Sequence, residues 1–303
     1  MSVDIDLMLR YSTLFLVEIG YRPAFSRILH PSRRPSGTAG RGSKSRKTQG
    51  LKYRRGKDGT TQTPRPAGKL IGPNPFKVAL ILGELNLPYT IDPIELADVK
   101  TPAVISLNPN GRLPALTDPI TGLTIWESGA IIEYLVATYD NGPKRKLSFE
   151  PGSVDHWHAI QWLHFQMSGQ GPYFGQSFWF QNHHPEILPS AITRYENEAR
   201  RVCSVLDGWL GGRLGVSGGG IGKERKYLVA EKCSFADLAF IPWQENVQKC
   251  IRYGADGGAF DQEKEFPHMH AWLERIKGRE AVKKAFVARA EAKKGQTERE
   301  VKK

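Results

Sequence analysis

Three short clusters of residues carry the chemistry that this sequence offers. The first is Asn74, which follows Gly72 and Pro73 and opens a segment with helical periodicity. A helix N-terminus presents free N–H groups and a partial positive charge, so it stabilises an anion such as a thiolate. The amide of Asn74 can donate a further hydrogen bond to that anion. The simpler alternative is that Asn74 only caps the helix.

The second cluster is the run Asn110-Gly111-Arg112-Leu113-Pro114. A proline that enters a strand after Gly and Arg suggests a cis peptide bond between Leu113 and Pro114. The backbone N–H and C=O of Leu113 would then face outward and could pair with a peptide-like ligand in antiparallel fashion. An ordinary trans loop is the alternative.

The third cluster, Trp126-Glu127-Ser128-Gly129, lies at a strand-to-helix turn. Ser128 and the helix N-terminus could hold a carboxylate, while Glu127 could hold an ammonium group. Alternatively, Ser128 caps the helix and Glu127 complements its dipole. Together the three clusters could bind a small zwitterionic peptide that carries a thiol.

The elements that must position these clusters follow from hydrophobic periodicity and turn residues. We expect a helix at 75–87, a strand at 89–95, a short helix at 102–107, strands at 113–117 and 123–126, and a helix at 127–139. The two later strands flank turn chemistry at 118–122 and therefore form a hairpin. A compact sheet also needs a strand before the first helix, and there only residues 69–71 could serve, close after Pro64 and Pro66.

After a linker at 141–152, the patterns are helical. We expect helices at 154–167, 192–210, 266–277 and 279–290, and a further helix that opens on a capping box from Ser234 to Asp237. The chain therefore divides into a basic disordered extension at 1–69, an α/β domain at 70–140, an all-helical domain at 153–292 and a frayed charged tail at 293–303.

The positive charge belongs to the N-terminal extension. Residues 1–70 hold 15 Lys and Arg against 4 Asp and Glu, whereas residues 71–303 hold 28 against 27. A basic tail can bind polyanions non-specifically, but the folded part has almost no net charge. We therefore rank a nucleic-acid-binding function low and expect no specific nucleic-acid partner.

Cysteine content and hydropathy argue against a disulfide-rich, a metal-binding and a membrane-spanning protein. The three cysteines, Cys203, Cys233 and Cys250, give neither a disulfide framework nor paired metal-ligand spacing, so we expect no metal. No stretch is apolar enough to span a membrane. The Arg- and Ser-rich start resembles a mitochondrial transit peptide, but Asp4 and Glu18 argue against one, so we expect a cytoplasmic location.

Several runs resemble one family closely. Residues 72–78, 108–116 and 125–131 are similar to the glutathione transferases related to the yeast nitrogen-regulatory prion protein, as are the helix break at 165–172 and the capping box at 234–237. The resemblance covers about 72–290. It implies a thioredoxin-like N-terminal domain followed by an all-α glutathione-transferase C-terminal domain.

The resemblance also implies roles for residues. Asn74 would contact the sulfur of glutathione, and Leu113 would pair its backbone with the cysteinyl unit. The further glutathione-binding residues that it implies are Glu127 and Ser128 for the γ-glutamyl end, Arg112 for a carboxylate and Lys100 for the glycyl carboxylate. The candidates for an apolar acceptor pocket are Tyr173, Phe174, Phe178 and Trp179, with core packing as their alternative role.

The leading function is thus a glutathione transferase, in which the glutathione thiolate attacks an electrophile, a peroxide or a disulfide. Glutathione is the co-substrate, a small hydrophobic electrophile its partner, and a homodimer the expected assembly. The alternative is a non-enzymatic transcriptional regulator of nitrogen metabolism built on a transferase-like body. Residues 1–70 contain no Asn and two Gln, which counts against a prion-like arm.

One feature departs from the family pattern. Members have a full strand just before the Gly-Pro-Asn run, whereas this chain has Pro-, Lys- and Gly-rich residues there. A mis-joined first exon is one explanation. Another is that residues 12–19, an apolar run, loop back to fill the gap, although the loop would be unusually long.

Overall fold

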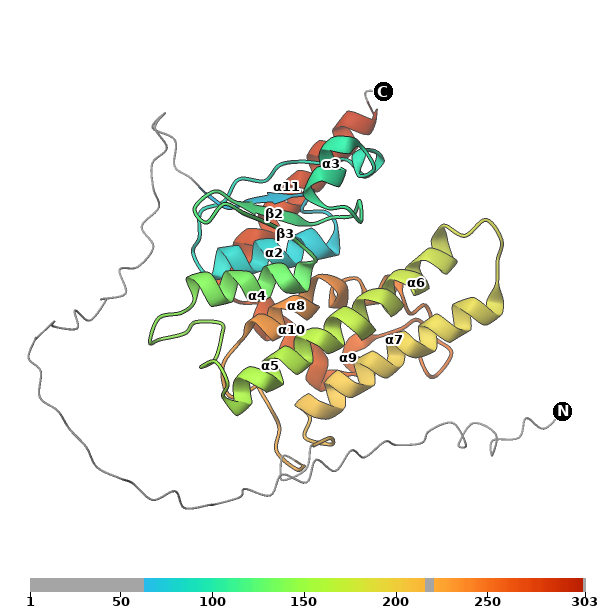
Figure 1. Ribbon diagram of the computed structural model, residues 1–303. Helices are drawn as coiled ribbons and strands as arrows, with labels where there is room; N and C mark the ends of the chain where they lie inside the picture. Colours follow the sequence, from blue (N-terminus) through green and yellow to red (C-terminus); the bar gives the residue numbers. More distant parts are fainter. Residues whose placement is uncertain (1–62, 216–220, 302–303) are drawn as a thin grey trace, which may run out of the picture. The chain divides into compact units, whose positions relative to one another are not determined.

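The computed structural model describes residues 63–215 and 221–301, with side chains to residue 295. The expected extension at 1–69 lies almost wholly outside these residues, and so does the apolar run at 12–19. The described part opens on a three-stranded antiparallel sheet in the order β1-β2-β3, formed by β1 (Arg65–Ala67), β2 (Ala115–Asp118) and β3 (Leu123–Trp126) (Figure 1). The hairpin of β2 and β3 was predicted from sequence.

The first strand comes from a different place than expected. It is Arg65–Ala67 rather than residues 69–71, and it includes Pro66, which pairs with Leu116 of β2. The chain therefore supplies its own short first strand before the helix.

The strand expected at 89–95 is absent, and one isolated parallel bridge between Ala67 and Asp92 takes its place. Asp92 N donates to Pro66 O at 3.1 Å, and Gly68 N donates to Asp92 O at 2.9 Å. Pro64 and Pro66 have no N–H, so on the side of β1 that faces Asp92 they accept hydrogen bonds through their carbonyls but cannot donate any. A regular strand pairing with residues 89–95 therefore does not form.

Three helices complete the sheet-containing part. They are α2 (Pro73–Glu84), α3 (Pro102–Leu107) and α4 (Ser128–Tyr139), with a 3-10 turn at Leu96–Asp98. The prediction for α3 is confirmed. The prediction that Asn74 is the N-cap of the first helix is wrong, because Gly72 is the N-cap and Asn74 is the second helical residue.

Residues 154–301, where described, contain helices and no β-strand, which confirms the all-helical prediction. The elements are α5 (Val154–Phe165), a π-helical turn (Gln166–Gln170), α6 (Gly171–Asn182), α7 (Pro189–Leu210), α8 (Phe235–Gln244), a 3-10 turn (Val247–Lys249), α9 (Gln262–Glu265), α10 (Pro267–Lys277) and α11 (Glu280–Val301). α11 continues beyond residue 290, where its end was expected.

The capping box predicted at the start of α8 is confirmed. The buried carboxylate of Asp237 accepts hydrogen bonds from Ser234 N at 2.9 Å and from Ser234 Oγ at 2.8 Å. It also accepts from Leu228 N and from Trp272 Nε1, both at 2.9 Å. These bonds fix the start of α8 and thereby the direction in which its later residues point.

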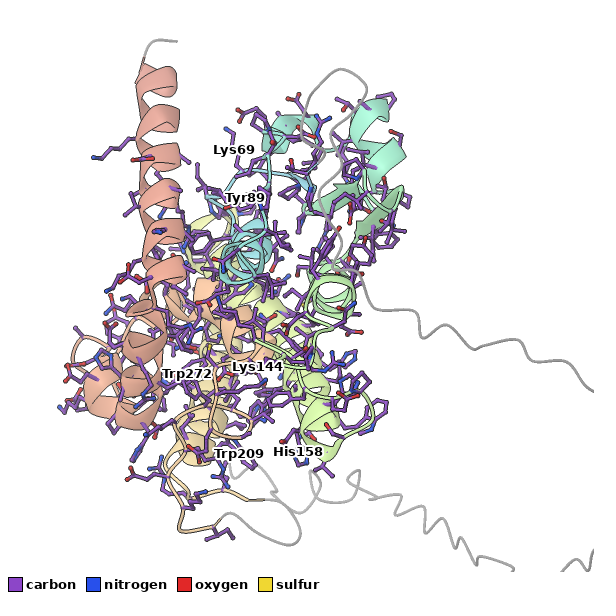
Figure 2. The ribbon with its side chains drawn as sticks, turned by 90° about the vertical axis from the view of Figure 1, so that its left-hand side faces the viewer. Lys69, Tyr89, Lys144, His158, Trp209 and Trp272 are labelled. Carbon is purple, nitrogen blue, oxygen red and sulfur yellow. The ribbon has the colours of Figure 1, made fainter. Side chains whose placement is uncertain are left out.

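One hydrophobic core joins the sheet-containing part to the helices. α2 packs against α8 and α11, and the rings of Phe76 and Phe286 meet edge to face at 5.1 Å. Figure 2 shows α11 as a long helix rising beside α2. The guanidinium of Arg289 lies 4.5 Å from the centre of the Phe76 ring and donates to Ile71 O at 2.9 Å.

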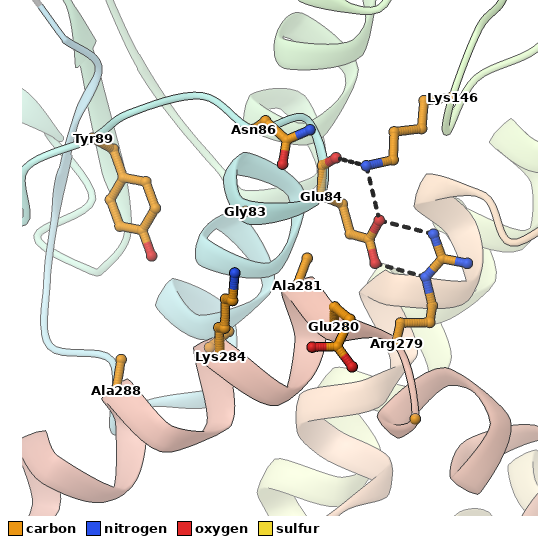
Figure 3. A pocket seen from close by; sticks show the side chains of 12 residues that line it. Gly83, Glu84, Asn86, Tyr89, Lys146, Arg279, Glu280, Ala281, Lys284 and Ala288 are labelled. Carbon is orange, nitrogen blue, oxygen red and sulfur yellow. Dashed lines mark hydrogen bonds and ion pairs between the residues drawn. The ribbon is translucent and has the colours of Figure 1, made fainter.

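A buried ion pair links the C-terminal end of α2 to the start of α11. Glu84 is 2 % exposed and accepts from Arg279 Nε at 2.6 Å and Nη2 at 2.8 Å, with Lys146 also in contact (Figure 3). Burial alone would raise the pKa of Glu84, but its bonds to Arg279 and Lys146 outweigh this and lower that pKa. These residues border a cavity of about 710 Å³ whose charges are largely paired.

In the described part of the chain, no helix has the length and apolar character needed to cross a membrane.

Candidate functional site

Two adjoining cavities meet at the N-terminus of α2. One, of about 450 Å³, is bounded by residues 69–75, by the segment 94–99 and by residues 111–113. The other, of about 400 Å³, is bounded by Lys77, Glu127, Met167 and the first turns of α6. Asn74, Arg112 and Trp243 border both cavities, so these three residues mark the place where the cavities adjoin.

Asn74 is flanked by two prolines, which limits the backbone donors of this helix end. Pro73 and Pro75 have no N–H, and Phe76 N donates to Gly72 O at 3.2 Å. Among residues 73–76 of the described chain, Asn74 therefore supplies the one backbone N–H that is left for an anion.

The side chain of Asn74 is half-buried and holds a partner from the helical part. Trp243 Nε1 on α8 donates to Asn74 Oδ1 at 3.0 Å. Sequence reasoning missed Trp243, because nothing in the sequence relates a tryptophan on α8 to a turn that lies 169 positions earlier.

The second cluster forms one wall of the site. The peptide bond between Leu113 and Pro114 is cis, as predicted, and Arg112 and Leu113 both line the first cavity. Asn108 holds the preceding turn by donating from Nδ2 to Arg112 O at 2.7 Å and accepting from Asn110 N at 2.9 Å.

Lys100 lies beside this turn. Its Nζ donates to Asn110 O at 2.9 Å, and its chain passes over Gly111, whose φ of +59° suits a glycine. Lys100 is exposed and borders neither cavity.

Glu127 and Ser128 face different environments. Glu127 has a φ of +68°, which is uncommon for a residue with a side chain, and its exposed carboxylate borders the second cavity. Ser128 is 2 % exposed and lines neither cavity itself. Its Oγ lies 3.3 Å from Lys77 Nζ.

Lys77 was not singled out from the sequence. It is 1 % exposed, lines the second cavity, and donates from Nζ to Gln166 Oε1 at 2.6 Å. Burial lowers the pKa of Lys77 to about 7, and the nearby charge of Glu127 offsets this only in part. A lone lysine inside the apolar run 76–82 was a signal that could have found it.

The four aromatic candidates for the acceptor pocket do not border either cavity. Phe174 is fully buried in the core, and Trp179 is 48 % exposed beside His183. Tyr173 lies against Tyr195, and Phe178 packs partly against the core. The residues of α6 that do border the second cavity are Gly171, Pro172, Gly175 and Gln176.

Family models match two segments of the chain. The glutathione S-transferase N-terminal domain matches residues 71–138, and the glutathione S-transferase C-terminal domain matches residues 184–280. Among curated proteins, the glutathione S-transferase-like protein gedE of Aspergillus terreus is 52 % identical over 217 residues, 72 % of this chain and 92 % of the relative. Glutathione S-transferase 2 of Schizosaccharomyces pombe is 43 % identical over 230 residues, 73 % of this chain and 94 % of the relative.

Two solved structures illustrate the likeness of fold. Glutathione transferase URE2P8 from Phanerochaete chrysosporium, solved with oxidized glutathione, has a TM-score of 0.67 and 36 % identity over 76 % of this chain and 96 % of its own. Ure2p in complex with glutathione has a TM-score of 0.65 and 31 % identity over 75 % of this chain and 95 % of its own.

Proposed function

This chain belongs to the glutathione S-transferase family, in its fungal Ure2p-like group, and we propose that it activates the glutathione thiol beside Asn74, where the two cavities adjoin. Glutathione transfer is the function, and the regulatory alternative has no better support. The observation that carries the proposal is that Asn74, in the first turn of a helix, borders both cavities.

The proposed chemistry is thiolate formation followed by nucleophilic attack. A free thiol has a pKa of about 8.5, and each unit by which the site lowers the pKa gives about ten times more thiolate at neutral pH. The Asn74 amide and its backbone N–H would donate to the sulfur and stabilise its negative charge. The thiol releases its proton to water, and the thiolate then forms a C–S bond to the electrophile, whose leaving group departs with the electron pair.

The remaining parts of glutathione would lie along the two cavities. Glu127 offers a carboxylate to the γ-glutamyl ammonium group in the second cavity. The α4 N-terminus would offer donors to the neighbouring carboxylate, together with Ser128, which is buried against Lys77 and Met167 in the wall of that cavity. Leu113 offers its backbone to the cysteinyl unit in the first cavity. Arg112 borders both cavities and offers its positive charge to a carboxylate of glutathione. Lys100 lies outside both cavities, beside Asn110, and offers its charge to the glycyl carboxylate.

Finer parts of the proposal concern the acceptor and the assembly. We propose a small hydrophobic electrophile that meets the sulfur beside Trp243 and Ile71, and extend the same thiolate chemistry to peroxides and disulfides. We also propose that the protein forms a homodimer and lies in the cytoplasm. We propose that its two domains span residues 70–140 and 153–292. Conjugation of chlorodinitrobenzene, compared with reduction of cumene hydroperoxide and of a mixed disulfide, distinguishes the three activities.

The proposed γ-glutamyl contacts are tested by calorimetry with glutathione. Ser128→Ala should weaken binding by about 1–3 kcal/mol, and Glu127→Gln by a similar amount, because each loses a hydrogen bond to a charged group. Thr124→Ala, on an exposed part of β3, is the control and should bind normally. Unchanged affinity in both test variants would refute this placement of the γ-glutamyl end.

A further inference from the structure

The hydrogen bond between Trp243 and Asn74 determines which atom of the Asn74 amide is left for a ligand. An indole N–H can donate but cannot accept, so the amide atom that faces it must be the oxygen Oδ1. The amide nitrogen Nδ2, which is a donor, is thereby turned away from Trp243. Within the described chain no hydrogen bond of Nδ2 to another residue is found, so it is free to donate to a ligand.

The indole of Trp243 packs against two glycines of α6. A Cβ placed on Gly171 would lie 3.6 Å from Trp243 Nε1, and one placed on Gly175 would lie 3.5 Å from the ring. Both glycines are on α6, one turn apart, so this face of α6 carries no side chain where the indole lies against it. A Cβ at either position would be in ordinary van der Waals contact with the ring, so the two glycines let the indole lie close against α6.

The two prolines beside Asn74 increase the importance of its amide. With no N–H at Pro73 or Pro75, the start of α2 offers an anion fewer backbone donors than an ordinary helix N-terminus does. If the amide turned over, its carbonyl oxygen would face the anion and repel it. The orientation of one amide therefore decides between attraction and repulsion.

Resting on the thiolate role proposed above for Asn74, we propose that Trp243 is a positioning residue of the transferase reaction: its N–H occupies Asn74 Oδ1 and so directs Asn74 Nδ2 toward the glutathione sulfur. Trp243 itself need not touch the reacting atoms. A residue of the helical part thus completes a thiolate site that otherwise belongs to the sheet-containing part.

The test compares Trp243→Phe, Asn74→Ala and the double variant with the unaltered full-length protein. Thiolate formation in the glutathione complex is followed by ultraviolet absorbance against pH, together with the pH profile of the conjugation rate. Asn74→Ala should move the acidic limb upward by about one pH unit or more, because a hydrogen bond to a charged group is lost. Trp243→Phe should lower the ionisation constant of the bound thiol by about twofold, which is the effect of an amide free to take either orientation equally.

Three controls separate positioning from general packing. Trp157→Phe makes the same chemical change at an exposed tryptophan of α5 and should leave the profile unmoved. Trp243→Phe should change the affinity for S-methylglutathione, which has no ionisable thiol, by less than it changes the ionisation of bound glutathione. Replacement of Trp243 by benzothienylalanine keeps the ring shape and lacks the N–H, so it serves if the phenylalanine variant does not fold.

The double variant decides the outcome. If Trp243 acts through Asn74, the double variant should have the profile of Asn74→Ala alone. An unmoved profile in Trp243→Phe and in the benzothienylalanine protein would overturn the inference, as would additive shifts in the double variant. An unmoved profile in Asn74→Ala would overturn the proposed role of Asn74 itself, and the inference with it.

Discussion

The side-chain amine of Lys77 is almost completely buried. Its Nζ has neighbouring dipoles in Gln166 and Ser128, and the nearby carboxylate of Glu127 is the charge that favours its protonated form. Desolvation outweighs these contacts and lowers the pKa of Lys77 from 10.5 to about 7. Near neutral pH, the folded protein therefore holds this amine partly without its proton.

Lys77→Met should make the protein more stable at neutral pH, by an amount that falls as the pH rises. The unfolded chain keeps this proton up to about pH 10.5, whereas the folded chain releases it near pH 7. Between these values the unfolded state binds more protons, so the unaltered protein gains stability as the pH rises through this window. At about pH 7 and below, the methionine variant avoids the cost of burying the amine and should gain up to a few kcal/mol.

Urea denaturation at about pH 7 and about pH 10 measures this difference. Lys283→Met, which changes an exposed lysine on α11, is the matched control and should show no such trend. A stability difference between Lys77→Met and the unaltered protein that stays constant or grows toward pH 10 would contradict the role assigned to burial.

Some residues of the site could be predicted from the sequence, and others only from the structure. Local signals locate Asn74 near a helix start and Leu113 before a cis proline, because each pattern is contained in a few neighbouring residues, although the N-cap is Gly72 and not Asn74. Trp243 and Lys77 depend on contacts across 169 and 89 positions, to Asn74 and Gln166 respectively, and sequence spacing does not encode such distances. Phe174 and Trp179 looked alike in the sequence, yet packing buries the first and leaves the second exposed.

Among the elements, the short strand β1 marks the limit of pattern-based prediction. Helix α7 follows from periodicity over several turns, whereas the short α3 follows from the turn that ends it and β3 from its hairpin. β1 is three residues long and contains Pro66, so its propensity argues against a strand. Pairing with β2 on one side and with Asp92 on the other compensates, and both partners are distant in the sequence.

The link between α2 and α11 should make Arg279 important for stability. Arg279→Ala would leave the buried Glu84 with Lys146 as its remaining charged partner. Breaking a buried pair costs about 3–5 kcal/mol, and the remaining lysine should reduce the loss to about 2–4 kcal/mol. The lowered pKa of Glu84 means that its contribution is present at neutral pH and is lost as the pH falls.

Thermal or urea unfolding of Arg279→Ala at neutral and at acidic pH tests this link. Lys283→Ala removes an exposed pair with Glu280 on the same helix and should change stability by less than about 1 kcal/mol. Equal effects of the two substitutions would show that the pair with Glu84 is not what secures the end of α2.

For the described chain as a whole, the continuous core should make unfolding cooperative. Phe76 of α2 and Phe286 of α11 belong to one packed set, and α2 also packs against α8. Ellipticity and tryptophan fluorescence should therefore report coincident transitions, and Phe286→Ala should lower both midpoints together. Two separate transitions would instead indicate that the sheet-containing part unfolds independently.

The bond from Trp243 to Asn74 also bears on gene shuffling. The linker at 141–152 is an inviting crossover point for libraries that recombine halves of related transferases. A crossover there would pair this chain's Asn74 with whatever residue the donor half carries at the position of Trp243. Chimeras whose donor half lacks an indole there should express and bind glutathione yet hold less of it as thiolate, so the residue at that position would rank recombinants before any assay.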